Sequence, residues 1–170
     1  KVHETLLKTG LAPTRLALEI TETALVKDMP RALATLRQVK SLGVRVAMDD
    51  FGTGYSSLSN LRAFPFNKIK IDSSFIKAVD TNGQVAAIVR AVLGLGRGLG
   101  LPVLAEGVET LGELKFLDAE ACEIGQGYYL GKPAPIEAFD DLTGHSKRTP
   151  VRADSRDGSL VLLKPSVRSA

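Results

Sequence analysis

The sequence is short of several residue types that mark other classes of protein. Its 170 residues include one cysteine, Cys122, two histidines and no tryptophan, and aromatic side chains make up 5%. A single cysteine excludes a disulfide framework. No apolar run reaches the length of a transmembrane helix. The lone cysteine and the lack of a signal-peptide pattern favour a reducing, cytoplasmic setting, with a membrane anchor left open for a segment outside this chain.

The net charge of +3 lies in the carboxyl-terminal tail. Residues 145–170 contain six basic side chains against Asp154 and Asp157, so residues 1–144 are nearly neutral and slightly acidic. A body of this charge without interleaved aromatic residues is a poor surface for duplex nucleic acid. We therefore expect one domain over residues 1–144 and a basic, loosely ordered tail over residues 145–170.

Apolar runs alternate with amphipathic segments between residues 16 and 127. The pattern predicts strands at 16–20, 44–48, 68–72, 102–105 and 122–127. Helix signals lie between them: Asp28 and Pro30 before a helix that ends at Gly43, Asn82 before a second that closes near residue 100, and a Thr110–Glu113 capping box. Five βα units predict a parallel sheet, either doubly wound or closed into a (β/α) barrel.

Polar residues at the strand ends favour the barrel. The five apolar runs end in Glu19, Asp49 with Asp50, Asp72, Glu106 and Gln126. The carboxyl ends of all barrel strands converge on one mouth, where active sites are built. A complete barrel takes about 250 residues, so we expect a TIM-like (β/α)8 barrel of which this chain holds about five carboxyl-terminal units. Taken singly, Asp72 or Gln126 is better explained as a helix cap or a solvated loop residue, and the functional interpretation depends on all five strand ends together.

Acidic side chains gathered at one mouth require either bound cations or raised pKa values. Because nearly all the available ligands are oxygens, Mg²⁺, Mn²⁺ or Ca²⁺ is favoured over a structural zinc ion. The adjacent carboxylates of Asp49 and Asp50 suit two metal ions, an arrangement that favours in-line attack on phosphate esters.

Three further residues at this mouth have side chains that could bind or orient the reacting groups. Lys70 lies two residues before Asp72, so both side chains point to the same side of the strand, and a cation lies inside the mouth. There it could orient a water molecule or a phosphate oxygen. Glu106 is a candidate base or water-bridged ligand, and Gln126 could hold a neighbour or the substrate by hydrogen bonds.

Five short motifs follow one another between Leu16 and Pro135. They are Glu19-Ile20-Thr21-Glu22, Asp49-Asp50-Phe51-Gly52-Thr53-Gly54-Tyr55-Ser56-Ser57-Leu58, Lys70-Ile71-Asp72, Ala105-Glu106-Gly107-Val108-Glu109-Thr110 and Gly125-Gln126-Gly127-Tyr128. In this order they resemble the carboxyl-terminal two-thirds of the EAL domain, the family of bacterial cyclic di-GMP phosphodiesterases. The resemblance implies metal-dependent hydrolysis of cyclic di-GMP to linear pGpG, in bacterial signalling.

The resemblance also implies a role for each matched residue. Two Mg²⁺ or Mn²⁺ ions would be held by Glu19, Asp49, Asp50, Asp72 and Glu106. Lys70 would position the attacking water, Glu106 would be the general base, and Gln126 would support the site. Glu22 would anchor a loop that couples substrate and metal binding to homodimer formation, made of Phe51, Gly52, Thr53, Gly54, Tyr55, Ser56 and Ser57.

The sequence departs from the family pattern in one respect. It contains neither the Glu-Ala-Leu motif nor the later Asn ligand, and Glu137-Ala138-Phe139 follows the last matched strand. We expect both ligands to belong to first strands outside this chain, so the intact protein is the expected enzyme and turnover by this chain alone is expected to be weak or absent. A sensory or diguanylate-cyclase domain is expected upstream.

Two other functions are compatible with the same residues. The first is a non-catalytic cyclic di-GMP receptor or protein-interaction module, which loss of the upstream ligands would favour. The second is a glycosidase with paired acids, which needs no metal, so metal dependence would argue against it.

Overall fold

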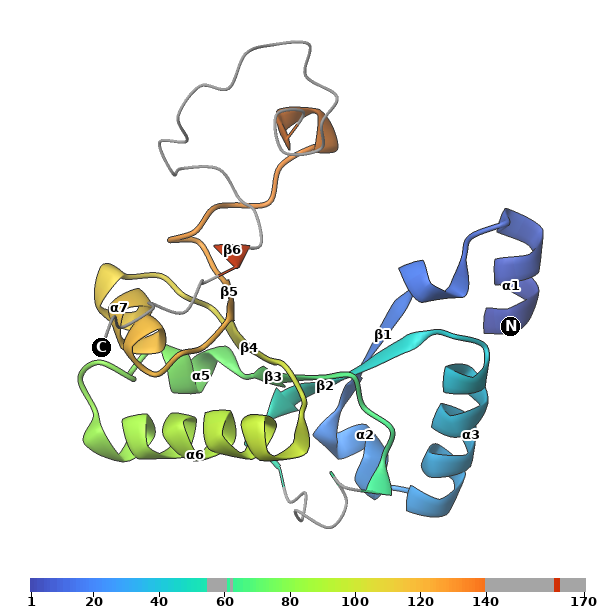
Figure 1. The fold of residues 1–170 in the computed structure, drawn as a ribbon, viewed down its shortest axis with the longest axis horizontal. Coiled ribbons are helices and arrows are strands. Elements are labelled where there is room, and N and C mark those ends of the chain that lie inside the picture. The colour runs from blue at the N-terminus through green and yellow to red at the C-terminus, as the bar shows by residue number, and fades with distance from the viewer. Residues whose placement is uncertain (55–60, 62, 140–160, 163–170) are drawn as a thin grey trace, which may run out of the picture.

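A parallel sheet of five strands forms the centre of the computed structural model, which describes residues 1–54, 61, 63–139 and 161–162 (Figure 1). The strands lie side by side in chain order: β1 (Ala17–Thr21), β2 (Arg45–Phe51), β3 (Lys68–Ile71), β4 (Val103–Glu106) and β5 (Ile124–Gln126). A two-residue strand, β6 (Val161–Leu162), pairs antiparallel with β5. Within the described residues β1 pairs only with β2, so the sheet is open at that edge.

The helices alternate with the strands, as the sequence predicts. They are α1 (Val2–Thr9), α2 (Glu22–Val26), α3 (Met29–Ser41), α5 (Ser73–Ile76), α6 (Gly83–Leu99) and α7 (Leu111–Ala119), with 3-10 turns η1 (Pro13–Arg15) and η2 (Ile136–Phe139). In the described part of the chain, no helix is both long and apolar enough to cross a bilayer.

The predicted capping residues set the ends of the helices. The Asp28 carboxylate accepts a hydrogen bond from the Arg31 backbone N–H at the start of α3. Asn82 accepts two at the start of α6, which ends at Gly100 in the left-handed conformation. Both hydrogen bonds of the Thr110–Glu113 capping box are present in α7. These local signals are strong because they satisfy backbone groups that a helix end leaves unpaired.

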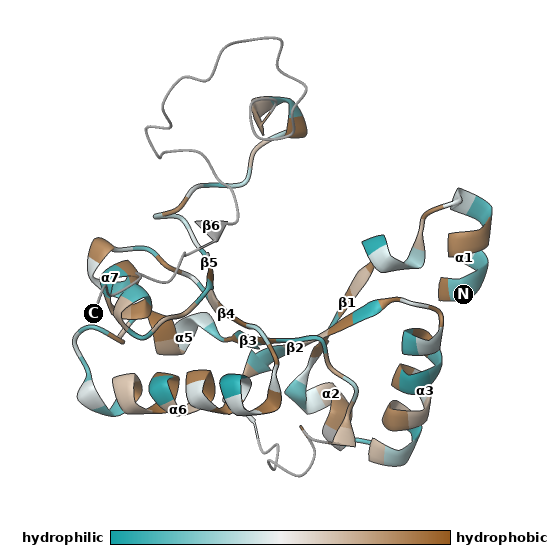
Figure 2. Cartoon of the chain, viewed as in Figure 1, coloured by the Kyte–Doolittle hydropathy of each residue, from teal (hydrophilic) through white to brown (hydrophobic). Residues whose placement is uncertain are grey.

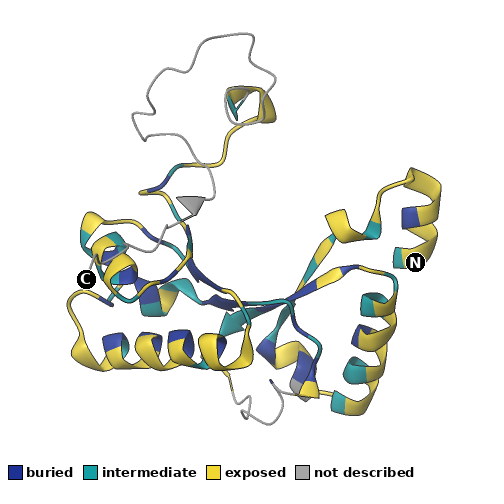
Figure 3. Cartoon of the chain, viewed as in Figure 1, coloured by how far each residue is buried: buried dark blue, intermediate teal, exposed yellow. Residues whose placement is uncertain are grey.

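The two faces of the sheet have different characters, because successive strand residues point to opposite sides. One face packs against the helices and carries a buried apolar core that includes Met48, Ile69 and Ile71. Figure 2 shows apolar positions along the strands and on α6, and Figure 3 shows that many of them are buried. The opposite face carries Glu19, Lys70 and Glu106, which the fold therefore separates from the core.

Strand β2 is longer than the sequence analysis predicts. It continues beyond Met48 to Phe51, so Asp49 and Asp50 lie within the strand. The pairing with β3 shifts between Met48 and Phe51, and Asp50 has a φ of 53°. A bulge of this kind keeps the strand paired while redirecting its side chains. The carboxylate of Asp50, although adjacent to Asp49 in the strand, lies near those of Asp49 and Glu106.

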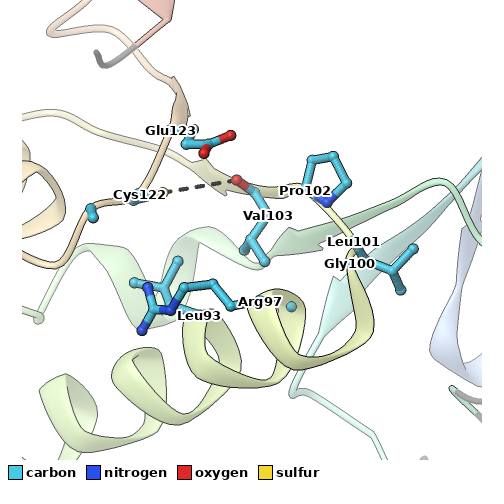
Figure 4. A pocket seen from close by; sticks show the side chains of 10 residues that line it. Leu93, Arg97, Gly100, Leu101, Pro102, Val103, Cys122 and Glu123 are labelled. Carbon is cyan, nitrogen blue, oxygen red and sulfur yellow. Dashed lines mark hydrogen bonds between the residues drawn. The ribbon is translucent and has the colours of Figure 1, made fainter. Parts of the chain in front are cut away.

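Strand β5 is shorter than predicted and begins at Ile124. The Cys122 backbone N–H donates to the Leu117 carbonyl oxygen, so this residue completes the end of α7. Beside it, at the amino ends of β4 and β5, lies a cavity of about 330 Å³ (Figure 4). Its lining includes Arg97, Val103 and Cys122. This end of the sheet is opposite to the predicted mouth.

Cys122 is expected to react slowly with thiol reagents. Its side chain is buried, and burial raises the pKa of the thiol above its ordinary value. Because the thiolate is the reactive form, labelling of the native chain by a disulfide reagent should be at least about tenfold slower than labelling in denaturant. Equal labelling rates for the native chain and the denatured chain would contradict the burial of Cys122 beside β5.

Two glycines of α6 form a matched pair for testing the packing of this helix. A Cβ at Gly96 would collide with the Val103 side chain and lie 2.9 Å from the Leu101 carbonyl oxygen, whereas a Cβ at Gly94 meets nothing within 4 Å. Gly96→Ala should lower the free energy of unfolding by about 1–3 kcal/mol. Gly94→Ala should raise it by about 0.5–1 kcal/mol, because alanine is the better helix former. Urea denaturation followed by circular dichroism tests both values, and effects of the same sign would contradict them.

Candidate functional site

The predicted site residues lie at the carboxyl ends of neighbouring strands. Glu19 is in β1, Asp49 and Asp50 are in β2, Lys70 is in β3, Asp72 follows β3, Glu106 ends β4 and Gln126 ends β5. The parallel pairing sets Thr21 opposite Asp49 and Glu106 opposite Gln126. Residues far apart in the chain therefore meet at the carboxyl ends of the strands.

Lys70 is the centre of this arrangement. Its Nζ lies 2.7 Å from Glu19 Oε2, 2.9 Å from Asp49 Oδ1 and 2.8 Å from Glu106 Oε1, and its side chain is 7% exposed. The ammonium group thus joins β3 to carboxylates of β1, β2 and β4. A buried lysine is tolerated only when its charge is paired, and here the pairing is threefold.

The ion pairs and the burial of these groups shift their pKa values in a consistent way. Burial by itself lowers the pKa of Lys70, but the contacts with Glu106, Glu19 and Asp49 outweigh it and raise the pKa above its ordinary value. Burial raises the pKa of Glu106, and the opposing effect of Lys70 cancels only part of that rise. Lys70 is therefore charged at neutral pH, and Glu106 is a better proton acceptor than an ordinary surface carboxylate.

Three carboxylates are close enough to share a metal ion. Oxygens of Asp49, Asp50 and Glu106 lie within 4.8 Å of one another. Burial, followed by the charges of Asp49 and Asp72, raises the pKa of Asp50, and the nearby charge of Lys70 offsets only part of that rise.

One oxygen of this group lacks a hydrogen bond. Asp49 Oδ1 is shielded from solvent, and its contact with Lys70 is short but does not have the angles of a hydrogen bond. It has no hydrogen-bond partner among the described residues. A buried, charged oxygen with spare acceptor capacity in an all-oxygen donor set fits a hard divalent cation such as Mg²⁺ or Mn²⁺.

Asp72 takes part in a helix cap. Its Oδ1 accepts hydrogen bonds from the backbone N–H and the hydroxyl of Ser74 at the start of α5. The Ser74 hydroxyl is the main cause that lowers the pKa of Asp72. Asp72 lies outside the three-carboxylate group, although its charge reaches Asp50. Its role as a metal ligand stays a prediction.

Gln126 lies beside Glu106, but its side chain is exposed. Its backbone carbonyl accepts a hydrogen bond from the Val108 N–H, which continues the pairing of the two strand ends. The structure brings Gln126 to the mouth, and its function there stays a prediction.

The start of the predicted loop is tied to Glu22 and Phe75. Glu22 is buried, and its Oε2 accepts hydrogen bonds from the backbone N–H groups of Gly54, at 3.1 Å, and Gly52, at 3.4 Å. Gly52 has a φ of 101°, and a Cβ there would lie 3.0 Å from the Phe75 ring. The loop residues Tyr55, Ser56 and Ser57 lie outside the described residues. Phe75 was not among the predicted site residues, because nothing in its local sequence separates it from a core residue.

Comparisons with known proteins agree with this geometry. The family model described as "EAL domain" matches residues 1–133. An uncharacterized signaling protein of Caulobacter vibrioides is 61% identical over 81% of this chain and 17% of its own length. MucR of Pseudomonas aeruginosa, named as a bifunctional diguanylate cyclase/cyclic di-GMP phosphodiesterase, is 43% identical over 80% of this chain and 20% of its own. The chain thus spans a fifth or less of either relative.

Solved structures share the fold. The PaMucR phosphodiesterase in complex with c-di-GMP has a TM-score of 0.77 and 43% identity, over 81% of this chain and 56% of that one. A manganese and cy-diGMP complex of BlrP1 from Klebsiella pneumoniae has a TM-score of 0.73 and 35% identity, over 78% and 34%. The expected TIM-like fold is confirmed, with this chain forming an incomplete barrel. On the family match and these relatives, the chain belongs to the EAL domain family.

Proposed function

We propose that the protein containing this chain hydrolyses cyclic di-GMP to linear pGpG with the help of Mg²⁺ or Mn²⁺. The observation that carries the proposal is the convergence of carboxylates from β1, β2 and β4 on Lys70 at the mouth. Membership of the EAL family and the phosphodiesterase named among its relatives support it.

The metal ions would be held by Asp49, Asp50 and Glu106, whose oxygens already lie together. We propose that Glu19 and Asp72 complete the ligand set for two ions. Bound divalent ions would supply Lewis-acid polarisation of the phosphodiester and would make water a better nucleophile at neutral pH.

Glu106 is proposed as the general base. Its carboxylate lies beside Lys70 and among the proposed metal ligands, where it could take a proton from a water at the mouth. Its carboxylate would accept a proton from water while the water oxygen bonds to phosphorus. The bond from phosphorus to the ribose 3′ oxygen breaks, that oxygen takes a proton from solvent and leaves as a hydroxyl group, and Glu106 returns its proton to solvent. One water is consumed and one linear dinucleotide with a 5′ phosphate is formed.

Lys70 and Gln126 would orient the reacting groups. The Lys70 ammonium has three N–H donors and lies among the carboxylates, where it could hold a phosphate oxygen or the attacking water. The exposed Gln126 amide could donate to the substrate from β5. Both groups would be held on strands, which fix positions better than free loops do.

The charge at the mouth explains why substrate binding should depend on metal. Four carboxylates, those of Glu19, Asp49, Asp50 and Glu106, lie around a single ammonium group. A dianionic dinucleotide is repelled by such a surface until cations reverse its charge. The homodimer and the upstream sensory or diguanylate-cyclase domain stay predictions.

Turnover is the direct test of this function. Cyclic di-GMP should be converted to pGpG by the longest form of the protein that contains this chain, in the presence of Mn²⁺. Asp49→Asn should reduce the rate by a factor on the order of 100 or more, because losing a ligand charge removes several kcal/mol of transition-state stabilisation. Asp118→Asn, an exposed aspartate of α7, is the matched control and should leave the rate unchanged.

The outcomes separate the candidate functions. Undiminished turnover in Asp49→Asn would refute the assigned site. Binding of cyclic di-GMP without turnover would favour the non-catalytic receptor instead.

Metal binding can be measured on the 170-residue chain. Calorimetric titration with Mn²⁺ should give a dissociation constant at least about tenfold larger for Glu106→Gln than for the unchanged chain. Glu109→Gln is the control, because Glu109 lies in the same loop but pairs with Lys77 at 3.1 Å. An equal loss of Mn²⁺ affinity in the two variants would indicate a general effect of charge and contradict a specific metal site.

A further inference from the structure

Three carboxylates surround the ammonium group of Lys70. Three carboxylate oxygens lie 2.7–2.9 Å from Nζ, and the side chain is 7% exposed. An ammonium group has three N–H donors, and the contact with Glu19 uses one of them in a hydrogen bond. The other two carboxylates lie just as close to Nζ, so a phosphate oxygen or an attacking water would have to take the place of one of them.

The lysine and a metal ion would use two of the same carboxylates. Asp49 and Glu106 belong both to the ion pairs of Lys70 and to the three carboxylates that can share a cation. A divalent cation between them would be repelled by the ammonium group at this short range. The two cations therefore compete for one site.

The contacts of Lys70 differ in a way that suggests which are given up. The contact with Glu19 has hydrogen-bond geometry, and the Glu19 side chain is 53% exposed. The contact with Asp49 lacks that geometry, and Oδ1 has no hydrogen-bond partner among the residues that the structure describes. Moving the ammonium group away from Asp49 therefore breaks an ion pair but no hydrogen bond.

We propose that Lys70 is the built-in cation of the metal-free site, which holds Asp49 and Glu106 in place until a divalent ion displaces it. Displacement then frees the ammonium group for the phosphate or the water. Metal binding would in this way switch Lys70 from a structural partner of the carboxylates to a positioning residue for the reaction. The inference rests on the proposed function for its last step only.

The test compares Lys70→Met with Lys77→Met in the 170-residue chain. Lys77 pairs with a single exposed carboxylate at the same end of the sheet, so its removal makes the same change in charge. With the competing cation gone, Lys70→Met should bind Mn²⁺ about tenfold more tightly. It should also unfold at a lower temperature in EDTA, because the carboxylates then repel one another. Lys77→Met should change neither value appreciably.

The opposite result would overturn the proposal. Mn²⁺ affinity that is unchanged or weaker in Lys70→Met would mean that the lysine does not compete with the metal. This outcome is independent of the proposed function, since turnover by the unchanged protein is measured separately and can be present or absent in either case.

A second measurement needs no variant and covers the case in which Lys70→Met does not fold. In chain labelled with ¹⁵N-lysine, the Lys70 side-chain NH₃⁺ resonance should be visible and protected from exchange in EDTA. Saturating Mg²⁺ should shift it and speed its exchange, while the Lys77 signal stays in place. An unmoved Lys70 resonance at saturating Mg²⁺ would refute displacement.

Discussion

The rest of the structure depends on one constraint, the pairing of the buried charge of Lys70. A lysine on this face of the sheet is stable only if carboxylates reach it from the strands on either side. Those carboxylates come from β1, β2 and β4, so the register of four strands has to be kept. A slip of one residue would turn Lys70 into the apolar core and remove its partners.

This constraint divides the sheet into two functional faces. The face toward the helices carries the apolar core and supplies stability through burial. The other face collects charged groups at the carboxyl ends of the strands, where parallel strands bring their ends together. The bulge at Asp50 adds a local adjustment, since it lets β2 continue while two adjacent aspartates reach the mouth. Stability and chemistry are thus assigned to different sides of the same strands.

Local signals made much of this predictable. Asn82, Thr110 and Gly100 act on backbone groups a few residues away, so their effect is visible in the sequence. Asp72 shows the limit of such signals. A carboxylate after a strand can cap the next helix or bind a ligand, and only the position of the Ser74 hydroxyl shows that it caps α5 here. The extension of β2 was equally hidden, because a bulge depends on pairing with a distant strand.

The sequence by itself determined the alternation of strands and helices, the acidic residues at the strand ends and the resemblance to the EAL family, because each depends on spacing along the chain. Tertiary structure alone decided which of those residues meet. Glu19 and Glu106 are far from Lys70 in sequence, yet both contact its ammonium group. Tertiary structure also decided that Asp49, Asp50 and Glu106 form a group that does not include Asp72. The physical reason is that ion pairing acts through space, across strands whose relative register no local pattern specifies.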